Sequence, residues 1–487
     1  MEKQLPKNWT NTELSNLISH VIGGDWGKEI DFTDDAYVEA LCIRGSEIKN
    51  WTRDKGSSAT LRKIKKSSLE SRKLELGDIL LEISGGGPEQ PVGRTVIIDY
   101  EALAFEPTIP KVCTNFLRLL RLDNKVNNTF INHYLQFFYN SGEITKYQGG
   151  SNNLRNLKFK EYVTIKIPLP PIPEQNRIVT KLDALFSQLE TIKSSMANIP
   201  LLLKDFRQQV LTQAVTGKLT EEWRKEKKIK NWNFKKLEKV TLKVGSGSTP
   251  TGGQAAYLDE GIPLIRSMNV HFNGIKYDGL AYLNESQAKG LKNVEVFEND
   301  VLLNITGASI GRVCLAPKDL SGARVNQHVC IIRVNNELKP SFLNIYLSSP
   351  IIQNLINNEN YGVTRQSFTK AQILELEIPI PLIDEQEIIL NKVESLFAKA
   401  DAIEKQYESL KAKIDNLPQA LLHKAFKGEL TEQLESDGDA RELLKEIEAL
   451  KAVSGKVKKG GKVVKDYEVK DEVLGMVAEP NFEYNKE

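Results

Sequence analysis

The residues with the clearest chemical potential are basic, and they gather in one stretch of the sequence. Ten basic and three acidic residues lie between Arg44 and Lys73, a local excess of seven positive charges, whereas the whole chain carries a net charge of +2. Positive charge segregated in this way is consistent with an acidic partner. It is equally consistent with an ordinary solvated loop, so both interpretations stay open at this point.

Residues for catalysis do not occur in any familiar arrangement. No G-x-x-x-x-G-K-[ST] phosphate loop is present, and the run Gly245–Pro250 lacks the lysine and the helix that such a loop requires. The histidines show no metal-ligand spacing, and the four cysteines never approach C-x-x-C. Neither a Ser-His-Asp set nor the Asn/Asp-Pro-Pro-aromatic tetrapeptide of amino-methyltransferases can be identified. We therefore predict no catalytic residue and no metal site, and reduced cysteines as in a cytoplasmic protein.

Length and composition set the scale of the fold that must position these residues. With 487 residues, of which 40% are hydrophobic, the chain is long enough for about two to four folded units. No run of about 18 apolar residues occurs, and no apolar signal segment follows Met1. We therefore expect neither a membrane span nor secretion.

An internal repeat organises the sequence. Shifting the chain by 211 residues aligns Ile165–Trp223 with Leu376–Leu434 without a gap, and about 18 of the 59 aligned positions are identical. Each copy contains a heptad pattern of apolar residues, which is typical of a coiled-coil helix. The predicted seam consists of Leu182, Leu185, Leu189, Ile192, Met196, Val393, Leu396, Ala400, Ile403 and Tyr407.

The two predicted helices have readable limits. Pro173 suits a first helical turn, and Gly217 and Gly428 are natural stops. Pro200 and Pro418 should each kink or break their helix. The order of globule, helix, globule and helix predicts that the two helices run antiparallel and bury each other's seam.

The globular regions that precede the helices resemble each other more weakly. Both contain short β-prone runs separated by Gly, Asn and Pro, which predicts strand-rich domains with a shared scaffold and different loops. The matched positions are Trp9 and Trp232, Ile43-Arg44 and Ile265-Arg266, Gly77–Leu81 and Asn299–Leu303, and Gly93-Arg94 and Gly311-Arg312.

The predicted fold is α+β, with two strand-rich domains separated by two long antiparallel helices that form an intramolecular coiled coil with pseudo-two-fold symmetry. A helix is expected at Ala440–Ala452, followed by a basic stretch, Ser454–Lys465, that looks mobile. The predicted segments are residues 1–172 (first domain), 173–231 (first helix region), 232–383 (second domain), 384–431 (second helix region) and 432–487 (helix and basic tail).

These motifs, in their doubled order, resemble the specificity (S) subunit of type I restriction–modification enzymes. The resemblance covers nearly the whole chain, except that the loop Ser84–Arg94 is longer than its counterpart in the second domain and the tail beyond Lys451 has no family parallel. It rests on Trp9 and Trp232, Gly77–Leu80 and Asn299–Leu302, Thr306–Arg312, Ile167–Gln175 and Ile378–Pro381, and the stops at Gly217–Thr220 and Gly428–Thr431.

The resemblance implies a function in DNA recognition. Each domain would be a target recognition domain that reads one part of a bipartite sequence in double-stranded DNA, and the helices would dock two modification subunits. In the assembled enzyme these partners would methylate adenine N6 with S-adenosylmethionine, and restriction subunits would cleave DNA with ATP and Mg²⁺. The chain itself would be non-catalytic, would bind no cofactor and would lie in the cytoplasm.

Candidate DNA-binding residues are the basic and amide side chains of the predicted loops, because such groups contact phosphates and base edges. Arg44 and Arg266 occur in both domains, so they suit phosphate or scaffold contacts better than sequence readout. The candidates are Arg44, Arg53, Lys55, Arg62, Lys63, Lys65, Lys66 and Arg94 in the first domain, and Arg266, Asn269, His271, Asn273, Arg312, Asn326, Gln327, Arg365 and Gln366 in the second.

Two other functions compete with this interpretation. The heptads and the near-zero net charge would also suit a coiled-coil protein-binding scaffold without DNA readout. A steep salt dependence of DNA binding would distinguish the two hypotheses. A self-contained restriction or methylation enzyme is disfavoured by the missing catalytic motifs.

Overall fold

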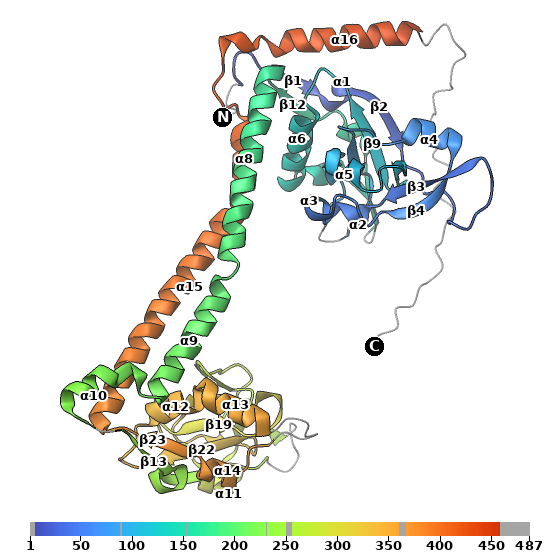
Figure 1. The fold of residues 1–487 in the computed structure, drawn as a ribbon. Helices are drawn as coiled ribbons and strands as arrows, with labels where there is room; N and C mark the ends of the chain where they lie inside the picture. Colours follow the sequence, from blue (N-terminus) through green and yellow to red (C-terminus); the bar gives the residue numbers. More distant parts are fainter. Residues whose placement is uncertain are drawn as a thin grey trace. The chain divides into compact units, whose positions relative to one another are not determined.

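The structure is a computed structural model that describes residues 5–87, 90–151, 154–229, 231–249, 256–359 and 367–457. The chain divides into two compact units, Met1–Thr191 with Lys413–Glu487, and Ile192–Ala412 (Figure 1). Each unit combines a strand-rich domain with parts of the long helices. The fold is therefore α+β, as predicted, with each unit built around its own sheets and its own hydrophobic core.

The first unit contains a four-stranded antiparallel main sheet. Its strands lie in the order β2 (Ile18–Gly23), β9 (Leu117–Leu122), β5 (Ile79–Glu82) and β7 (Thr95–Ile97). A second sheet has the order β4 (Thr60–Lys65), β3 (Tyr37–Ile43) and β8 (Lys111–Cys113), and a third has β10 (Gln148–Ser151), β11 (Leu154–Leu157) and β6 (Ser84–Gly85). Helix α6 (Asn128–Asn140) contributes Phe130, Ile131 and Leu135 to the core.

The second unit repeats this plan. Its main sheet has the order β14 (Thr241–Ser246), β22 (Val329–Val334), β19 (Val301–Asn304) and β20 (Val313–Leu315). A second sheet has β18 (Ala281–Leu283), β15 (Ile262–Ile265) and β21 (Arg324–Val325), and a short hairpin has β16 (Val270–His271) and β17 (Gly274–Ile275). Helices α12 (Pro340–Ser348), α13 (Pro350–Glu359) and α14 (Lys370–Glu375) complete the domain.

A buried ion pair occurs at the same place in both main sheets. Arg121 of β9 donates two hydrogen bonds of 2.8 Å to Asp78, and Arg333 of β22 donates two of 2.7 Å to Asp300. The residue before each aspartate has a positive φ, which glycine and asparagine tolerate best. This explains why Gly-Asp in one domain matches Asn-Asp in the other, and it aligns the two sheets residue by residue.

Two short β-pairs attach each domain to its helices. In the first unit β1 (Thr10–Glu13) pairs with β12 (Lys166–Leu169), and in the second β13 (Asn233–Lys236) pairs with β23 (Glu377–Ile380). The repeated Pro-x-Pro segments form the second strand of each pair. Edge pairs of this kind tolerate proline because one side of each strand needs no ladder hydrogen bond.

The long helices are α8 (Ile172–Met196), α9 (Ile199–Val215) and α15 (Ile383–Phe426). The predicted interruption near Pro200 is confirmed, because two residues separate the end of α8 from the start of α9. Pro418, in contrast, lies inside α15 and does not break it. In the second unit Arg207 binds Asp401 and Glu404, while Lys392 donates to the Leu219 carbonyl, so α9 and α15 run antiparallel as predicted.

The seam is buried only in parts. Leu182, Leu189, Val393 and Ala400 are buried, and Leu185, Met196, Leu396 and Tyr407 are partly buried. Ile192 and Ile403, however, are 45% and 49% exposed, so the predicted burial does not hold at these two positions. Leu182 and Val393 are buried because they belong to the domain cores. Two helices that pack only against each other bury no more than a narrow stripe on each helix.

The predicted C-terminal helix is present as α16 (Ala440–Val457). Its Ile447 is fully buried in the core of the first unit, and Lys451 donates to the carbonyls of Ser15 and Asn16. Most of the predicted basic stretch lies outside the described residues. Among the described residues, no helix has both the length and the hydropathy needed to cross a membrane.

Candidate nucleic-acid interface

Loops of the second domain meet at one edge of its main sheet. β14 and β19 end at this edge and β22 and β20 begin there, because the neighbouring strands are antiparallel. The loops are joined by hydrogen bonds from Gly247 N to Asn326 O (3.1 Å) and from Asn304 Nδ2 to Ser267 O (2.8 Å). We call residues 247–249, 266–269, 304–312 and 326–328 the second loop edge.

The first domain has the same edge. β2 and β5 end there and β9 and β7 begin there. Gly24 N donates to Leu117 O (3.2 Å), and a Cβ at Gly24 would lie 2.1 Å from Thr114 O, so only glycine fits where these loops cross. Gly247 holds the equivalent place, with a Cβ distance of 1.7 Å to Val325 O. We call residues 24–36, 44–47, 83–87, 90–94 and 114–116 the first loop edge.

The second loop edge carries a small hydrogen-bonding network of polar side chains. The exposed Gln327 accepts from the Thr249 hydroxyl and lies 3.1 Å from His328 Nε2. His328 Nδ1 hydrogen bonds to the Thr306 hydroxyl. Amide, imidazole and hydroxyl groups supply both donors and acceptors, which is the chemistry needed to read base edges. Of these residues, only Gln327 was predicted from the sequence.

Other predicted residues of the second domain have varied surroundings. Asn269 is fully buried and donates to Lys276 O (2.9 Å), and the buried Asn326 accepts from His328 N (3.1 Å), so we leave both out of the candidate surface. The exposed Asn273 lies in the turn between β16 and β17, and the partly buried His271 hydrogen bonds to Met268 O. Arg312 is partly exposed in its loop, and Arg266 lies over the Tyr257 ring. Arg365 and Gln366 lie outside the described residues.

The two predicted arginines of the first loop edge are engaged within the domain. Arg94 donates to both carboxylate oxygens of the buried Glu82 (2.9 and 2.6 Å) and to Gly45 O (3.1 Å). Arg44 forms an ion pair of 2.8 Å with Glu47. Hydrogen bonding to Glu82 raises the pKa of Arg94, and hydrogen bonding to Glu47 raises that of Arg44. Both guanidinium groups therefore help to hold the loops in place.

Half of the ten basic residues of the run have acidic partners, Arg44 among them. Arg53 pairs with Asp54, Lys55 with Asp99, Arg62 with Glu29, and Lys63 with Glu39. Lys65 and Lys66 are exposed, and among the described residues no carboxylate pairs with either of them. Ion pairing thus reduces the free positive charge predicted for the run, and Lys65 and Lys66 keep theirs at the end of β4.

Sequence reasoning missed the buried glutamates that join each domain to its helix. The Trp9 indole donates to Glu174 (2.8 Å), which also accepts from Thr431 (3.3 Å) and Gln433 (2.8 Å). We call these four residues the first clasp. In the second clasp, Glu385 accepts from Trp232 (2.9 Å), Thr220 (2.7 Å) and Arg224 (2.6 Å). The repeated Glu-Gln pair and the repeated Leu-Thr stop were the available signals.

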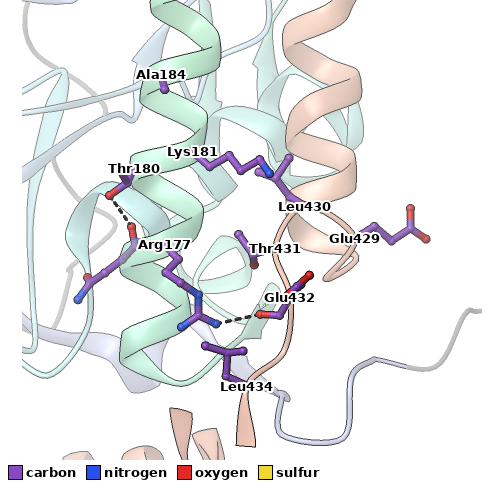
Figure 2. Close-up of a pocket in the computed structure, with 10 residues that line it drawn as sticks. Arg177, Thr180, Lys181, Ala184, Glu429, Leu430, Thr431, Glu432 and Leu434 are labelled. Atoms are coloured by element: carbon purple, nitrogen blue, oxygen red, sulfur yellow. Dashed lines mark hydrogen bonds between the residues drawn. The ribbon is translucent and has the colours of Figure 1, made fainter. Parts of the chain in front are cut away.

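A groove lies beside the first clasp (Figure 2). It has a volume of about 830 Å³ and is formed by Asn176–Ala184 of α8 and the segment Glu429–Leu434 after α15. Arg177 reaches from α8 to the Glu432 carbonyl (2.9 Å) and forms an ion pair of 2.6 Å with Asp437. Hydrogen bonding to Arg177 lowers the pKa of Asp437. Within the described part of the chain, no cluster of His, Cys, Asp or Glu suits a metal ion.

Comparison with known protein families gives a match that covers most of the chain. The family model described as the type I restriction modification DNA specificity domain matches residues 7–200 and again residues 229–412. The two matches correspond to the two copies of the internal repeat.

Individual relatives agree with this match. The EcoKI specificity subunit of a type I restriction enzyme from Escherichia coli K12 is 29% identical over 472 residues, which cover 93% of this chain and 97% of the relative. The EcoBI specificity subunit from Escherichia coli is 33% identical over 356 residues, 68% of this chain and 74% of the relative. The crystal structure of the HsdS subunit from Thermoanaerobacter tengcongensis shares the fold, with a TM-score of 0.60 and 18% identity over 88% of this chain and 99% of that one.

Proposed function

The chain belongs to the family of type I restriction–modification DNA specificity domains, and from this premise we propose that its two domains read the two parts of a bipartite, asymmetric DNA target. The observation that carries the proposal is the contrast between scaffold and loops. Both domains keep the sheet order and the buried Arg–Asp pair, yet the loop edges present different side chains. A common scaffold with unlike edges suits two unlike half-sites.

The repeated parts of the chain would serve a repeated partner. We propose that two copies of one modification subunit dock on the helices, and that restriction subunits join through them. Leu201 and Leu202 of α9 and Leu410 of α15 are exposed apolar side chains, as expected of a protein-binding surface. The groove of Figure 2 offers a further contact surface in the first unit.

The chemistry would belong to these partners. In this proposal the modification subunits transfer a methyl group from S-adenosylmethionine to adenine N6, and the restriction subunits use ATP and Mg²⁺ for cleavage. This chain would bind none of these cofactors and would act in the cytoplasm as a non-catalytic recognition subunit. A scaffold without DNA readout fits poorly with a chain in which both repeats match a DNA specificity model.

The proposal is tested by mapping N6-methyladenine in DNA from cells that express the chain with its modification subunit. We expect a split, asymmetric methylated motif that is absent from cells expressing the modification subunit alone. Unchanged methylation despite a stable complex of the two proteins would contradict the proposal. Methyl transfer by the purified chain alone would contradict its non-catalytic part.

A further inference from the structure

The alignment of the two main sheets exposes one position where the domains differ in charge. Arg121 and Arg333 are equivalent because each binds the aspartate that precedes the neighbouring strand of its sheet, β5 or β19. Three residues earlier, Arg118 of β9 therefore corresponds to Cys330 of β22. The strand pairing agrees, since Arg118 lies opposite Leu81 and Cys330 opposite the matching Leu303.

Arg118 occupies a costly environment. Its guanidinium lies 4.2 Å from the centre of the Phe159 ring, and its Nε is buried without a hydrogen-bond partner. Burial lowers its pKa, and among the described residues no carboxylate pairs with it. A cation removed from water without a partner is unfavourable. Cys330 fills the same position at low cost, as a thiol buried in the core of the second unit.

The aromatic partner of Arg118 also has a counterpart of different chemistry. The repeat places Phe159 opposite Lys370, and the backbone confirms the match, because Leu157 N donates to Ile83 O and Phe368 N to Ile305 O, both at 2.8 Å. Burial raises the pKa of the Cys330 thiol to about 12, and the nearby charge of Lys370 opposes this shift. The paired backbone thus places Lys370, two residues after Phe368, where the first domain has Phe159, two residues after Leu157.

The two domains therefore each carry a positive charge beside this matched segment but supply it from different elements. Arg118 of strand β9 supplies the charge in the first domain, and Lys370 of helix α14 supplies it in the second. Lys370 is exposed, has no carboxylate partner among the described residues, and sits in the first turn of its helix, where the helix dipole disfavours a cation. Packing alone gives no reason for both domains to keep a positive charge here when Arg118 supplies it in one domain and Lys370 in the other.

We propose that Arg118 and Lys370 are equivalent phosphate-binding residues, one in each domain, that hold the DNA backbone of each half-site in register. This inference rests on the proposed function. Both charges lie beside the segment whose backbone pairs with Ile83 or Ile305 at the loop edge, which continues the candidate interface. An arginine and a lysine share charge but not hydrogen-bond geometry, so their common ligand is a phosphate rather than a base.

The test uses the complex of the chain with its modification subunits. The variants Arg118→Met and Lys370→Met remove the charge and keep an unbranched side chain. We expect each to weaken binding by about tenfold, both to a duplex with the methylated motif and to an unrelated duplex. Each should also reduce the slope of log affinity against log salt by about 0.9, and the double variant by about 1.8. Arg118→Lys should retain most of the binding, and the methylated motif should not change.

Matched controls are lysines whose charge is already paired with a carboxylate within the domain. Lys125 pairs with Glu446 beyond the other end of β9, and Lys236 of β13 pairs with Glu375. Lys125→Met and Lys236→Met should leave the salt slope unchanged. Thermal unfolding of all variants separates lost binding from lost folding.

Three results would overturn the inference. A change in one half of the methylated motif would make the residue a base reader, and an unchanged slope in a folded variant would make it structural. Weaker capture of the modification subunit with normal DNA binding would assign the charge to a protein interface. Failure of the proposed function is a different outcome, because the unaltered chain would then direct no methylation motif.

Discussion

The two domains differ most where the equivalent strands β3 and β15 end. In the first domain the chain continues into α2 (Gly45–Ile48) and α3 (Trp51–Asp54), and Trp51 is buried with its indole donating to Ile97 O (3.1 Å). In the second domain the β16–β17 hairpin follows, and Phe272 at its turn is 51% exposed. The sheets beneath are the same. Recognition can thus diverge after a duplication without disturbing the residues that hold the scaffold together.

Removing the ion pair that both domains share should have the largest effect on the stability of the two units. In Asp78→Asn and Asp300→Asn, the arginine loses the buried carboxylate that it binds, although Arg121 keeps an ion pair of 3.1 Å with the exposed Glu75. We expect each change to destabilise its own unit by about 2 to 4 kcal/mol, slightly below the cost of breaking a fully buried pair because the arginines are partly exposed. Urea unfolding followed by hydrogen exchange would locate the loss. Equal destabilisation of both units by one variant would contradict their independence.

The two clasps should contribute unequally to the stability of the two units. Glu385→Gln leaves Arg224 without its carboxylate, whereas the hydrogen-bond partners of Glu174 among the described residues, Trp9, Thr431 and Gln433, are uncharged. We expect a loss of about 2 to 3 kcal/mol for Glu385→Gln and about 1 kcal/mol for Glu174→Gln. Denaturant midpoints of the two variants measure the difference. An equal or larger effect of Glu174→Gln would contradict the assignment of this difference to the charge of Arg224.

The different loop edges should act on different halves of the target. Gln327→Ala removes an exposed amide from the second loop edge, where it could read a base edge. We expect about tenfold poorer discrimination at one base of one half-site. Methylation mapping would show a relaxed position in that half and an unchanged first half. Relaxation in both halves would contradict the assignment of one domain to each half-site.

The smallest effects concern the basic run. Lys65 and Lys66 are free to contact phosphates, whereas Lys63 already pairs with Glu39 at 3.1 Å. Replacing both free lysines by glutamine should reduce the salt slope of DNA binding by up to about 1.8, with no change in sequence preference. Lys63→Gln is the matched control and should have little effect. Equal effects of all three lysines would show that ion pairing within the domain does not decide which charges bind DNA.

Features that depend on local sequence patterns were predicted well. The heptads predicted the helices, and the order of globules and helices predicted their antiparallel packing. Pro200 predicted the interruption, and the β-prone runs predicted the strand-rich domains. The continuity of α15 through Pro418 was not predicted, because local propensity does not include the packing that supports a helix. Ile192 and Ile403 fit the heptad pattern but remain exposed. The heptad periodicity predicts on which face of the helix a residue lies, but not whether another element covers that face.

The candidate site depended more on contacts between distant segments. The positive excess of the basic run is reduced because Glu29 and Asp99 lie outside it in sequence but beside it in space. Asn269 has a side chain suited to reading adenine, but its amide donates to a backbone carbonyl inside the domain. Arg118 showed no signal in the sequence, because its significance comes from the register that places it opposite Cys330. Sequence patterns therefore predicted the scaffold and its repeat, but not which polar groups stay free.

The central claim is that each domain reads one half of the target, and exchanging a single domain tests it most directly. Residues 232–383 would be replaced by the corresponding segment of the EcoKI specificity subunit, and N6-methyladenine would be mapped in cells that also contain the modification subunit. We predict that one half of the methylated motif changes and that the other half stays as it is in the unaltered chain. A change in both halves, or in neither half despite a folded and assembled protein, would contradict the claim.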